Sequence, residues 1–232
     1  MTTTQTVKTS YVQGENVTYA YRILGKSNGN LPLLILHHFR ASIDHWDPLF
    51  ISSLASQREV ILFDNAGIGK SSGSVPDSIK GMADHVAAFL AAMKISQIDL
   101  YGFSIGGNVA QQLVLDQPSL VRKLILSGTG AGVGSEDPHI DSPNAALVAK
   151  LTGGDPDLDA MTRLFFYPSE SSRAAAAEWW GRIQERTKET CGEERSSFVT
   201  GAGFMAQINA LKKWKSGEGE FSTFPIQWIR IC

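Results

Sequence analysis

The chain of 232 residues is long enough for one α/β domain with its own hydrophobic core, and its 43% hydrophobic and 19% charged content is ordinary for a globular protein. The formal net charge of −2 at pH 7 excludes the broad basic surface that holds nucleic acid or acidic lipid. We therefore expect a small-molecule substrate, with no nucleic-acid partner and no membrane partner.

The two cysteines, Cys191 and Cys232, lie far apart and form neither a disulfide framework nor a metal-ligand pattern, which predicts free thiols and no bound metal. The first residues contain no apolar leader segment, and no apolar run approaches the length of a membrane span. The expected location is the cytoplasm. The sequence indicates no cofactor, and it does not indicate an oligomeric state.

The N-terminal part of the chain has strand and turn patterns. Residues 7–13 and 16–23 alternate in polarity, and Gly14 and Glu15 separate them, which is typical of a β-hairpin. Residues 33–38 then form a short, nearly continuous apolar run, which predicts a strand covered on both faces. We expect the hairpin to add an antiparallel edge to the sheet.

Predicted strands and helices alternate from the first buried strand onward. Apolar residues at helical spacing predict the helices, and short apolar runs predict the strands. After the first buried strand, the predicted elements are a helix at 43–55, a strand at 59–63, a helix at 78–93, a strand at 97–103, a helix at 108–116 and a strand at 121–127. This order predicts an α/β fold with a mostly parallel sheet, right-handed crossovers and helices on both faces.

The composition changes after Gly128, where a loop rich in Gly, Asp, Ser and Pro begins. Only helical patterns follow, at residues 144–151, 158–166, 171–188 and 198–215. We therefore expect an α/β core over residues 1–130, an inserted all-helical lid over residues 131–216, and a tail at 217–232. The last eight residues of that tail alternate weakly, as a return strand of the core would.

One motif carries chemistry: Gly102-Phe103-Ser104-Ile105-Gly106 matches G-x-S-x-G. It follows an apolar strand and opens a helix, which is the setting of a nucleophile elbow, where a sharp turn presents the serine above the sheet. The alternatives are a glycine-rich turn with a helix-capping serine, or a dinucleotide site. Against the second, Gly106 and Gly107 do not complete a G-x-G-x-x-G pattern.

Three segments together resemble the α/β-hydrolase superfamily, in the branch similar to haloperoxidases (perhydrolases) and small esterases. They are residues 36–40 with Trp46 downstream, residues 63–71, and residues 102–107, and the likeness covers residues 7–128. The resemblance implies a hydrolase-type mixed sheet with an N-terminal antiparallel hairpin and an inserted helical lid. It does not identify a substrate.

The resemblance also implies roles for matched positions. Ser104 would be the catalytic nucleophile, and the backbone N–H groups of Phe39 and Ile105 would form the oxyanion hole. The chain departs from the family at His38, where relatives carry a glycine after the first histidine. Residues 64–71 are interpreted as a structural turn, with Asp64 capping or bracing it.

The family places an acid and then a histidine after the nucleophile, and no such pair is found in the sequence. The histidines at 37, 38, 45, 85 and 139 lie in other segments. We therefore expect a chain in which the last strand and helix of the fold are missing. A substitute dyad of His139 with Asp137 or Asp141 is an alternative that sequence proximity alone suggests.

Two hypotheses about function follow. The first is a serine hydrolase acting on a small ester, lactone or related acyl compound through an acyl-enzyme on Ser104, without a cofactor, and impaired by loss of the acid and the histidine. The second is a non-catalytic, hydrolase-derived module that binds a small ligand, or an inert truncated fragment. Dehalogenases and epoxide hydrolases are disfavoured, because those relatives carry aspartate where Ser104 stands.

Overall fold

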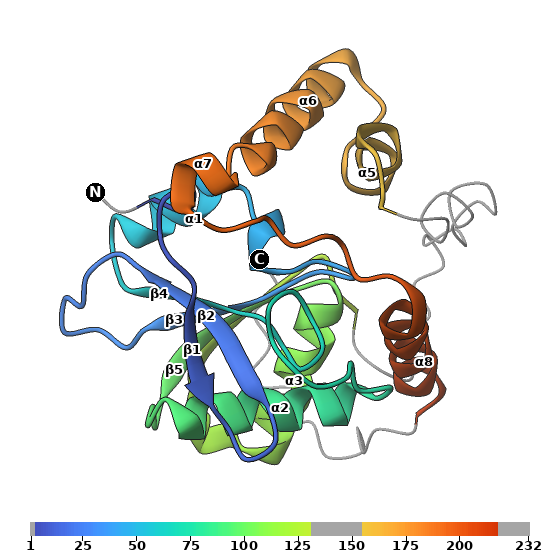
Figure 1. The fold of residues 1–232 in the computed structure, drawn as a ribbon. Helices are drawn as coiled ribbons and strands as arrows, with labels where there is room; N and C mark the ends of the chain where they lie inside the picture. The colour runs from blue at the N-terminus through green and yellow to red at the C-terminus, as the bar shows by residue number, and fades with distance from the viewer. Residues whose placement is uncertain (1–2, 131–154, 218–232) are drawn as a thin grey trace.

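The computed structural model describes residues 3–130 and 155–217, and a six-stranded sheet forms its centre (Figure 1). The strand order is β1-β2-β4-β3-β5-β6. The strands are β1 Ser10–Gln13, β2 Thr18–Leu24, β3 Leu33–Leu36, β4 Val60–Phe63, β5 Ile98–Phe103 and β6 Val121–Ser127. β1 and β2 form an antiparallel hairpin, and β2 pairs antiparallel with β4. The strands β4, β3, β5 and β6 are parallel to one another. The predicted α/β class and antiparallel edge are confirmed.

The two faces of the sheet are covered by different helices. Leu34, Ile61 and other inward residues of one face pack against α2 Ile79–Ala92 and α3 Ile105–Asp116. Leu33 is the neighbour of Leu34 in β3, and Leu62 is the neighbour of Ile61 in β4. Both pack on the opposite face of the sheet, against α1 Pro48–Ala55. Because side chains alternate across a strand, a run that is apolar at every position needs a cover on both faces.

Local capping explains where the first helices begin. The predicted helix at 43–55 is two elements, a 3-10 turn at Ile43–His45 and α1. Asp47 accepts the N–H of Leu49 at 2.9 Å and Pro48 stands at the first helical position, so a new helix begins there. Ser78 caps α2 in the same way, accepting the N–H of Gly81 at 3.0 Å.

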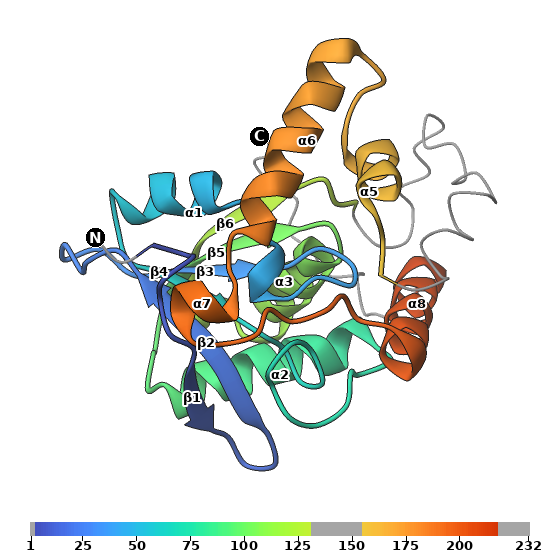
Figure 2. The same ribbon diagram turned by 45° about the horizontal axis from the view of Figure 1, so that its top comes forward.

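Four helices are described in the C-terminal section: α5 Leu158–Phe165, α6 Glu170–Gln184, α7 Lys188–Cys191 and α8 Gly201–Ser216. Figures 1 and 2 show α5 and α6 projecting together from one end of the molecule, whereas α8 lies beside α2. Arg182 of α6 forms an ion pair with Asp47 at 2.8 Å. The predicted helix at 144–151 and the predicted strand at the C-terminus lie outside the described residues.

A buried ion cluster links the C-terminal section to the N-terminal segment. Asp44 accepts from Arg22 at 2.6 Å and lies 3.2 Å from Nε of Arg186. Arg186 also donates to the carbonyls of Thr4 and Val7 and pairs with the carboxylate of Glu193 at 2.9 Å. Segments about 180 residues apart in the sequence are thereby held against one edge of the sheet.

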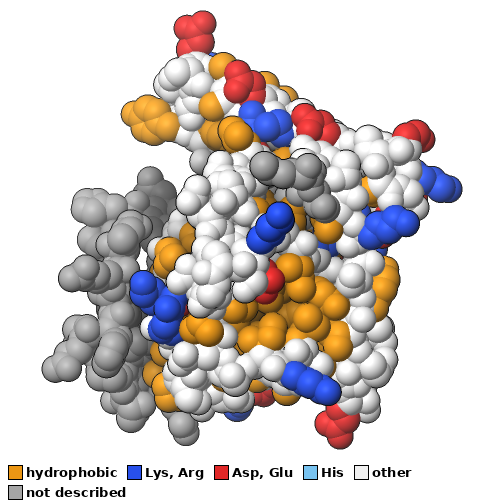
Figure 3. Space-filling view, turned by 90° about the vertical axis from the view of Figure 1, so that its left-hand side faces the viewer, with side chains coloured by type: hydrophobic (Ala, Val, Ile, Leu, Met, Phe, Trp, Pro, Cys, Tyr) orange, Lys and Arg blue, Asp and Glu red, His pale blue; other side chains and the backbone are white. Residues whose placement is uncertain are grey.

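The surface has no extended region of one charge on the face shown in Figure 3. Lys, Arg, Asp and Glu stand singly there, around a central group of hydrophobic side chains. Among the described residues, no helix is both long and apolar enough to cross a bilayer.

Candidate active site

The carboxyl ends of the parallel strands bring the motif segments to one edge of the sheet. Ser104 follows β5 and precedes α3, and its φ of 55° and ψ of −123° place it in a conformation that L-residues rarely adopt. Its N–H donates to the carbonyl of Ser127 at 3.0 Å, and its own carbonyl accepts from Gly107 at 2.8 Å. These bonds hold a tight strand-to-helix turn at the predicted position.

The glycines around Ser104 are required by space. A Cβ on Gly102 would lie 2.6 Å from the carbonyl oxygen of Gly106, and one on Gly106 would lie 2.5 Å from that of Leu36. No side chain fits at either distance, because both neighbours are backbone atoms. The G-x-S-x-G pattern therefore lets α3 approach both β5 and the end of β3.

The loop after β3 carries Phe39, the other residue predicted to supply an oxyanion donor. Ala41 donates to the carbonyl of His38 at 3.1 Å, which closes a turn with Phe39 and Arg40 at its centre. Within the described residues, no hydrogen-bond acceptor contacts the N–H of Phe39. Ile105 is the first residue of α3, where helix geometry provides no intrahelical acceptor for the N–H. Both predicted donors thus belong to backbone turns at the same sheet edge.

Arg40 is the residue that connects this loop to the C-terminal section. It is buried, with a φ of 67°. Its carbonyl accepts from Val199 at 2.8 Å, its Nε donates to the carbonyl of Val199 at 2.7 Å, and its N–H donates to Oε1 of Gln207 at 2.9 Å. Its guanidinium lies 5.4 Å from the ring centre of Phe204. Residues from α8 and the segment before it therefore fix the conformation next to Phe39.

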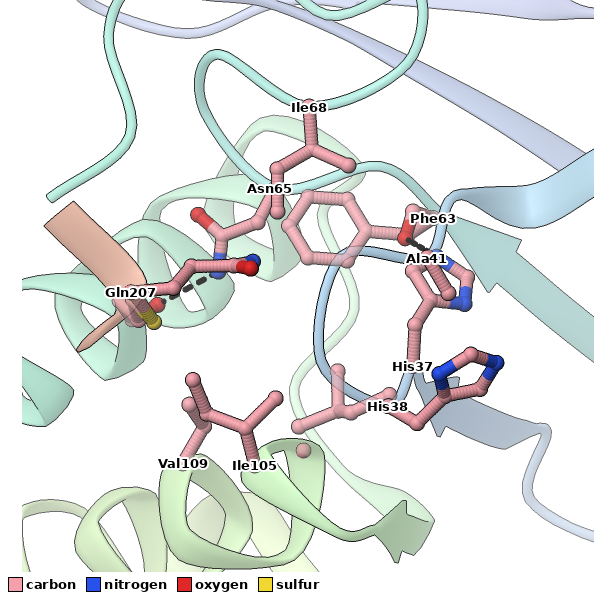
Figure 4. Close-up of a pocket in the computed structure, with 12 residues that line it drawn as sticks. His37, His38, Ala41, Phe63, Asn65, Ile68, Ile105, Val109 and Gln207 are labelled. Carbon is pink, nitrogen blue, oxygen red and sulfur yellow. Dashed lines mark hydrogen bonds between the residues drawn. The ribbon is translucent and has the colours of Figure 1, made fainter. Parts of the chain in front are cut away.

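Two cavities flank the elbow. The smaller, about 30 Å³, is bounded by His37 and His38, by Ile105 of α3, by Asn65 and by Gln207 of α8 (Figure 4). The larger, about 280 Å³, is bounded by aromatic rings of the α1 region, of β5 and of α5 and α6. His38 borders both cavities. The second volume is close to the lower end of the range typical of small-molecule sites.

Residues 32–182 match the family described as alpha/beta hydrolase fold, which is more than half of the chain. The chain belongs to the α/β-hydrolase fold family. A solved α/β-hydrolase fold protein from Chitinophaga pinensis is 31% identical, with a TM-score of 0.78 over 92% of this chain and 74% of that chain.

Two curated relatives are similar over most of this chain. A poly(3-hydroxyalkanoate) depolymerase from Ectopseudomonas oleovorans is 38% identical over 80% of this chain and 61% of its own length. A protein named as a carbamate hydrolase, RutD, from Rhizobium rhizogenes is 33% identical over 73% of this chain and 59% of its own length. The matches span 39% to 59% of the length of three RutD relatives.

The histidines next to the elbow have structural partners. His37 donates from Nε2 to the carbonyl of Phe63 at 2.6 Å and accepts at Nδ1 from Nε1 of Trp46 at 2.5 Å. Desolvation by burial lowers its pKa to about 3 and that of His38 to about 4. His38 contacts the carbonyl of Phe39 through Nδ1 at 3.0 Å and lies between aromatic rings. Both rings are therefore neutral at pH 7.

The other histidines have partners other than Ser104 or lie outside the described residues. His45, which ends the 3-10 turn, stacks on Phe198, and Nδ1 of His85 forms a hydrogen bond with the hydroxyl of Tyr19 at 2.7 Å. The dyad hypothesis for His139 falls on residues that are not described. Within the described part of the chain, no histidine forms a hydrogen bond with Ser104.

Asp64 braces the turn after β4, as predicted. Its carboxylate accepts from the N–H groups of Ile43 at 2.8 Å and Lys70 at 3.1 Å, and a Cβ on Gly69 would lie 2.1 Å from it. Complete burial raises the pKa of Asp64 to about 7, against the opposing effect of those two donors. Its buried contacts are those of a structural residue.

Sequence reasoning did not identify Arg40 and Gln207. Arg40 lies in the matched segment at 36–40 but was given no role there, Gln207 belongs to no motif, and the two are 167 positions apart. Arg40 has a positive φ without being a glycine, and no local sequence pattern signals it, because the contacts that hold it come from Gln207 of α8 and from Val199 before that helix. Among the described residues, no group of three or more His, Cys, Asp or Glu side chains is arranged to hold a metal ion.

Proposed function

We propose that this chain is a serine hydrolase of small ester, lactone or related acyl compounds, with Ser104 as the nucleophile. The observation that carries the proposal is the strained backbone of Ser104 between a glycine-shaped strand end and the start of α3. Such strain persists only where the surrounding structure holds it, and it is concentrated at functional sites. The relatives named as hydrolases and as a depolymerase support the same class of reaction.

The proposed reaction begins with attack of the Ser104 hydroxyl oxygen on the acyl carbon. The carbonyl oxygen then carries negative charge, and the N–H groups of Phe39 and Ile105 would stabilise it. The new carbon–oxygen bond forms as the hydroxyl proton passes to a base, and the leaving group departs with a proton. Water then cleaves the acyl-enzyme.

Among the described residues, no side chain forms a hydrogen bond with the Ser104 hydroxyl, as the base of this mechanism would. A serine without a base is a poor nucleophile at neutral pH, and removal of triad members leaves only the residual catalysis of the oxyanion hole and binding. We therefore propose slow turnover for this chain by itself. The two relatives are longer than the part that matches this chain, which is 59% and 61% of their own length. The activities in their names are therefore those of the longer proteins.

We also propose that residues 131–216 act as a lid over an α/β core of residues 1–130, with residues 217–232 as a tail. Contacts of Val199 and Gln207 with Arg40 support this division, as does the position of α5 and α6 beside the larger cavity. A lid that is attached to the loop of Phe39 would couple closure of the site to the geometry of the proposed oxyanion hole.

The test is covalent labelling with a fluorophosphonate, together with hydrolysis of p-nitrophenyl acetate. We expect the wild type to be labelled and to release p-nitrophenol slowly, and Ser104→Ala to do neither. Ser53→Ala, which removes an exposed hydroxyl of α1, is the control and should behave as the wild type. Equal labelling of wild type and Ser104→Ala would reject the nucleophile and favour the non-catalytic binding module.

A further inference from the structure

The cavity of about 280 Å³ lies directly beside the elbow. Phe103, which precedes Ser104 in the chain, borders it, and so does Ser127, whose carbonyl accepts the N–H of Ser104. An apolar cavity of about 150 Å³ is enough to hold a benzene ring. A single ring with a substituent therefore fits here, and it would lie next to the proposed nucleophile.

The walls of this cavity are mostly aromatic. Trp46 and Phe50 stack at a centroid distance of 5.8 Å, and Trp46 meets Tyr101 edge to face at 5.9 Å. On the other side, Phe103 and Phe165 lie 5.6 Å apart, with Phe165 contributed by α5. Rings of this kind offer flat faces and edges that suit the stacking of another ring.

One residue that lines the cavity carries a buried polar atom without a hydrogen-bond partner among the described residues. His45 borders the cavity with only 2% of its surface exposed, and its Nε2 is buried without a hydrogen bond among the described residues. Nδ1 accepts the N–H of Ser42 at 2.9 Å, which fixes that nitrogen as the unprotonated one. Burial also keeps the pKa of His45 well below its usual value. The neutral ring therefore carries its hydrogen on Nε2, as a donor without an acceptor.

A buried donor without an acceptor is costly, and such groups are uncommon in folded proteins. We propose that this cavity binds a ring-sized apolar group that carries one oxygen acceptor, and that Nε2–H of His45 donates to that oxygen. If the chain is a hydrolase as proposed above, this group would be the non-reacting part of its substrate, and only that statement rests on the proposed function. The binding itself does not require Ser104.

The test uses the Ser104→Ala chain, in which no acyl transfer can occur. Acetophenone and isopropenylbenzene have nearly the same shape, but only the first has an oxygen acceptor. We expect acetophenone to bind roughly fivefold more tightly, the ratio that one neutral hydrogen bond gives. Both titrations are followed through the indole N–H signals of the tryptophans in NMR spectra.

The decisive variant is His45→Asn in the same chain. An asparagine oxygen can keep the bond to the N–H of Ser42, whereas the Nε2–H donor is lost, so the preference should fall below about twofold. The matched control is His85→Asn on α2, which should keep the preference. An equal affinity for the two probes in the Ser104→Ala chain, or a preference that survives His45→Asn, would overturn the proposal.

A second measurement serves if His45→Asn does not fold. The Nε2–H signal of His45, observed in Ser104→Ala, should move when acetophenone is added and stay in place with isopropenylbenzene. A chemical shift of the His45 Nε2–H signal that stays the same with both probes overturns the proposal. Because these readouts need no turnover, their failure is distinct from failure of fluorophosphonate labelling at Ser104.

Discussion

Ser104 has a backbone conformation that an L-residue keeps only where the surrounding chain holds it. The bonds from Ser127 and Gly107, and the close approach that Gly102 and Gly106 permit, supply that support. The strain and the open amide at the start of α3 are therefore consequences of one local sequence. Substitution of Gly102 or Gly106, rather than of Ser104, tests whether the turn requires residues without a side chain at these positions.

Gly106→Ala should destabilise the fold by about 1–3 kcal/mol, because the added Cβ meets the carbonyl of Leu36 at 2.5 Å and the backbone must move. The free energy of unfolding in urea measures the effect. Gly181→Ala in α6 is the matched control, since its Cβ meets nothing within 4 Å. That change should leave stability unchanged or raise it by about 0.5–1 kcal/mol. Equal losses in both variants would contradict the spatial argument.

At the next level, elements that are distant in sequence cooperate to shape the loop of Phe39. The loop follows β3, but the acceptor for the N–H of Arg40 comes from α8 and its other backbone partners come from Val199. Arg40 stays at a φ of 67° because these contacts hold it there. Contacts from Gln207 of α8 and from Val199 therefore help to shape the proposed site.

Gln207→Leu should slow fluorophosphonate labelling of Ser104 by roughly tenfold, because misalignment of the proposed oxyanion donor, the N–H of Phe39, weakens stabilisation of the developing charge. The substitution removes the acceptor of the Arg40 N–H and leaves that buried group unsatisfied. Gln207→Glu keeps an acceptor and should restore most of the rate. Asn209→Leu, at an exposed position of the same helix, should have no effect. An unchanged labelling rate in Gln207→Leu would show that α8 does not influence the proposed site.

Across the whole molecule, the buried ion cluster joins the N-terminal segment, the sheet and the C-terminal section. Asp44→Asn leaves Arg22 and Arg186 without their shared buried carboxylate, and the expected loss is about 3–5 kcal/mol in the free energy of unfolding. Asp84→Asn, which breaks an exposed pair with Lys80, should change it by less than about 1 kcal/mol. Chemical denaturation compares the two. Similar values for both would show that the cluster adds nothing beyond a surface pair.

The buried titratable groups predict how stability depends on pH. Burial lowers the pKa of His37 to about 3, of His38 to about 4 and of His45 well below its usual value. The unfolded chain binds these protons first, so stability falls as the pH drops below 6.5. Asp64, with its pKa raised to about 7, acts in the opposite direction, since the folded chain holds its proton more tightly. Because three histidines act in one direction and one carboxyl in the other, the free energy of unfolding should fall between pH 7 and pH 5.

His38→Phe tests that explanation. The new ring can keep the contacts with Phe103 and Phe165, but it cannot bind a proton. The loss of unfolding free energy between pH 7 and pH 5 should shrink by about 2 kcal/mol, which is the linkage of one group between pH 6.5 and pH 5. Urea unfolding at the two pH values measures it. A loss as large as that of the wild type would show that His38 titrates normally.

Much of the fold could be predicted because its signals are local. Fully apolar runs predicted β3 and β4, polar alternation with Gly14 predicted the hairpin, and an apolar stripe predicted α2. The start of α3 was placed three residues late, at 108 instead of Ile105, since helical periodicity is weak across the glycines of the elbow. The division of the first helix at Pro48 had a local signal in the Asp-Pro pair.

The sequence by itself determined the family, the order of strands and helices, and the turn at Ser104, because each depends on residues within a few positions of one another. Only the tertiary structure decided which groups surround that turn. The contacts of Arg40 with Gln207 and Val199, and the aromatic cavity beside His45, join segments that no periodicity relates. Such contacts depend on the path of the whole chain, and the sequence of either partner does not reveal the other.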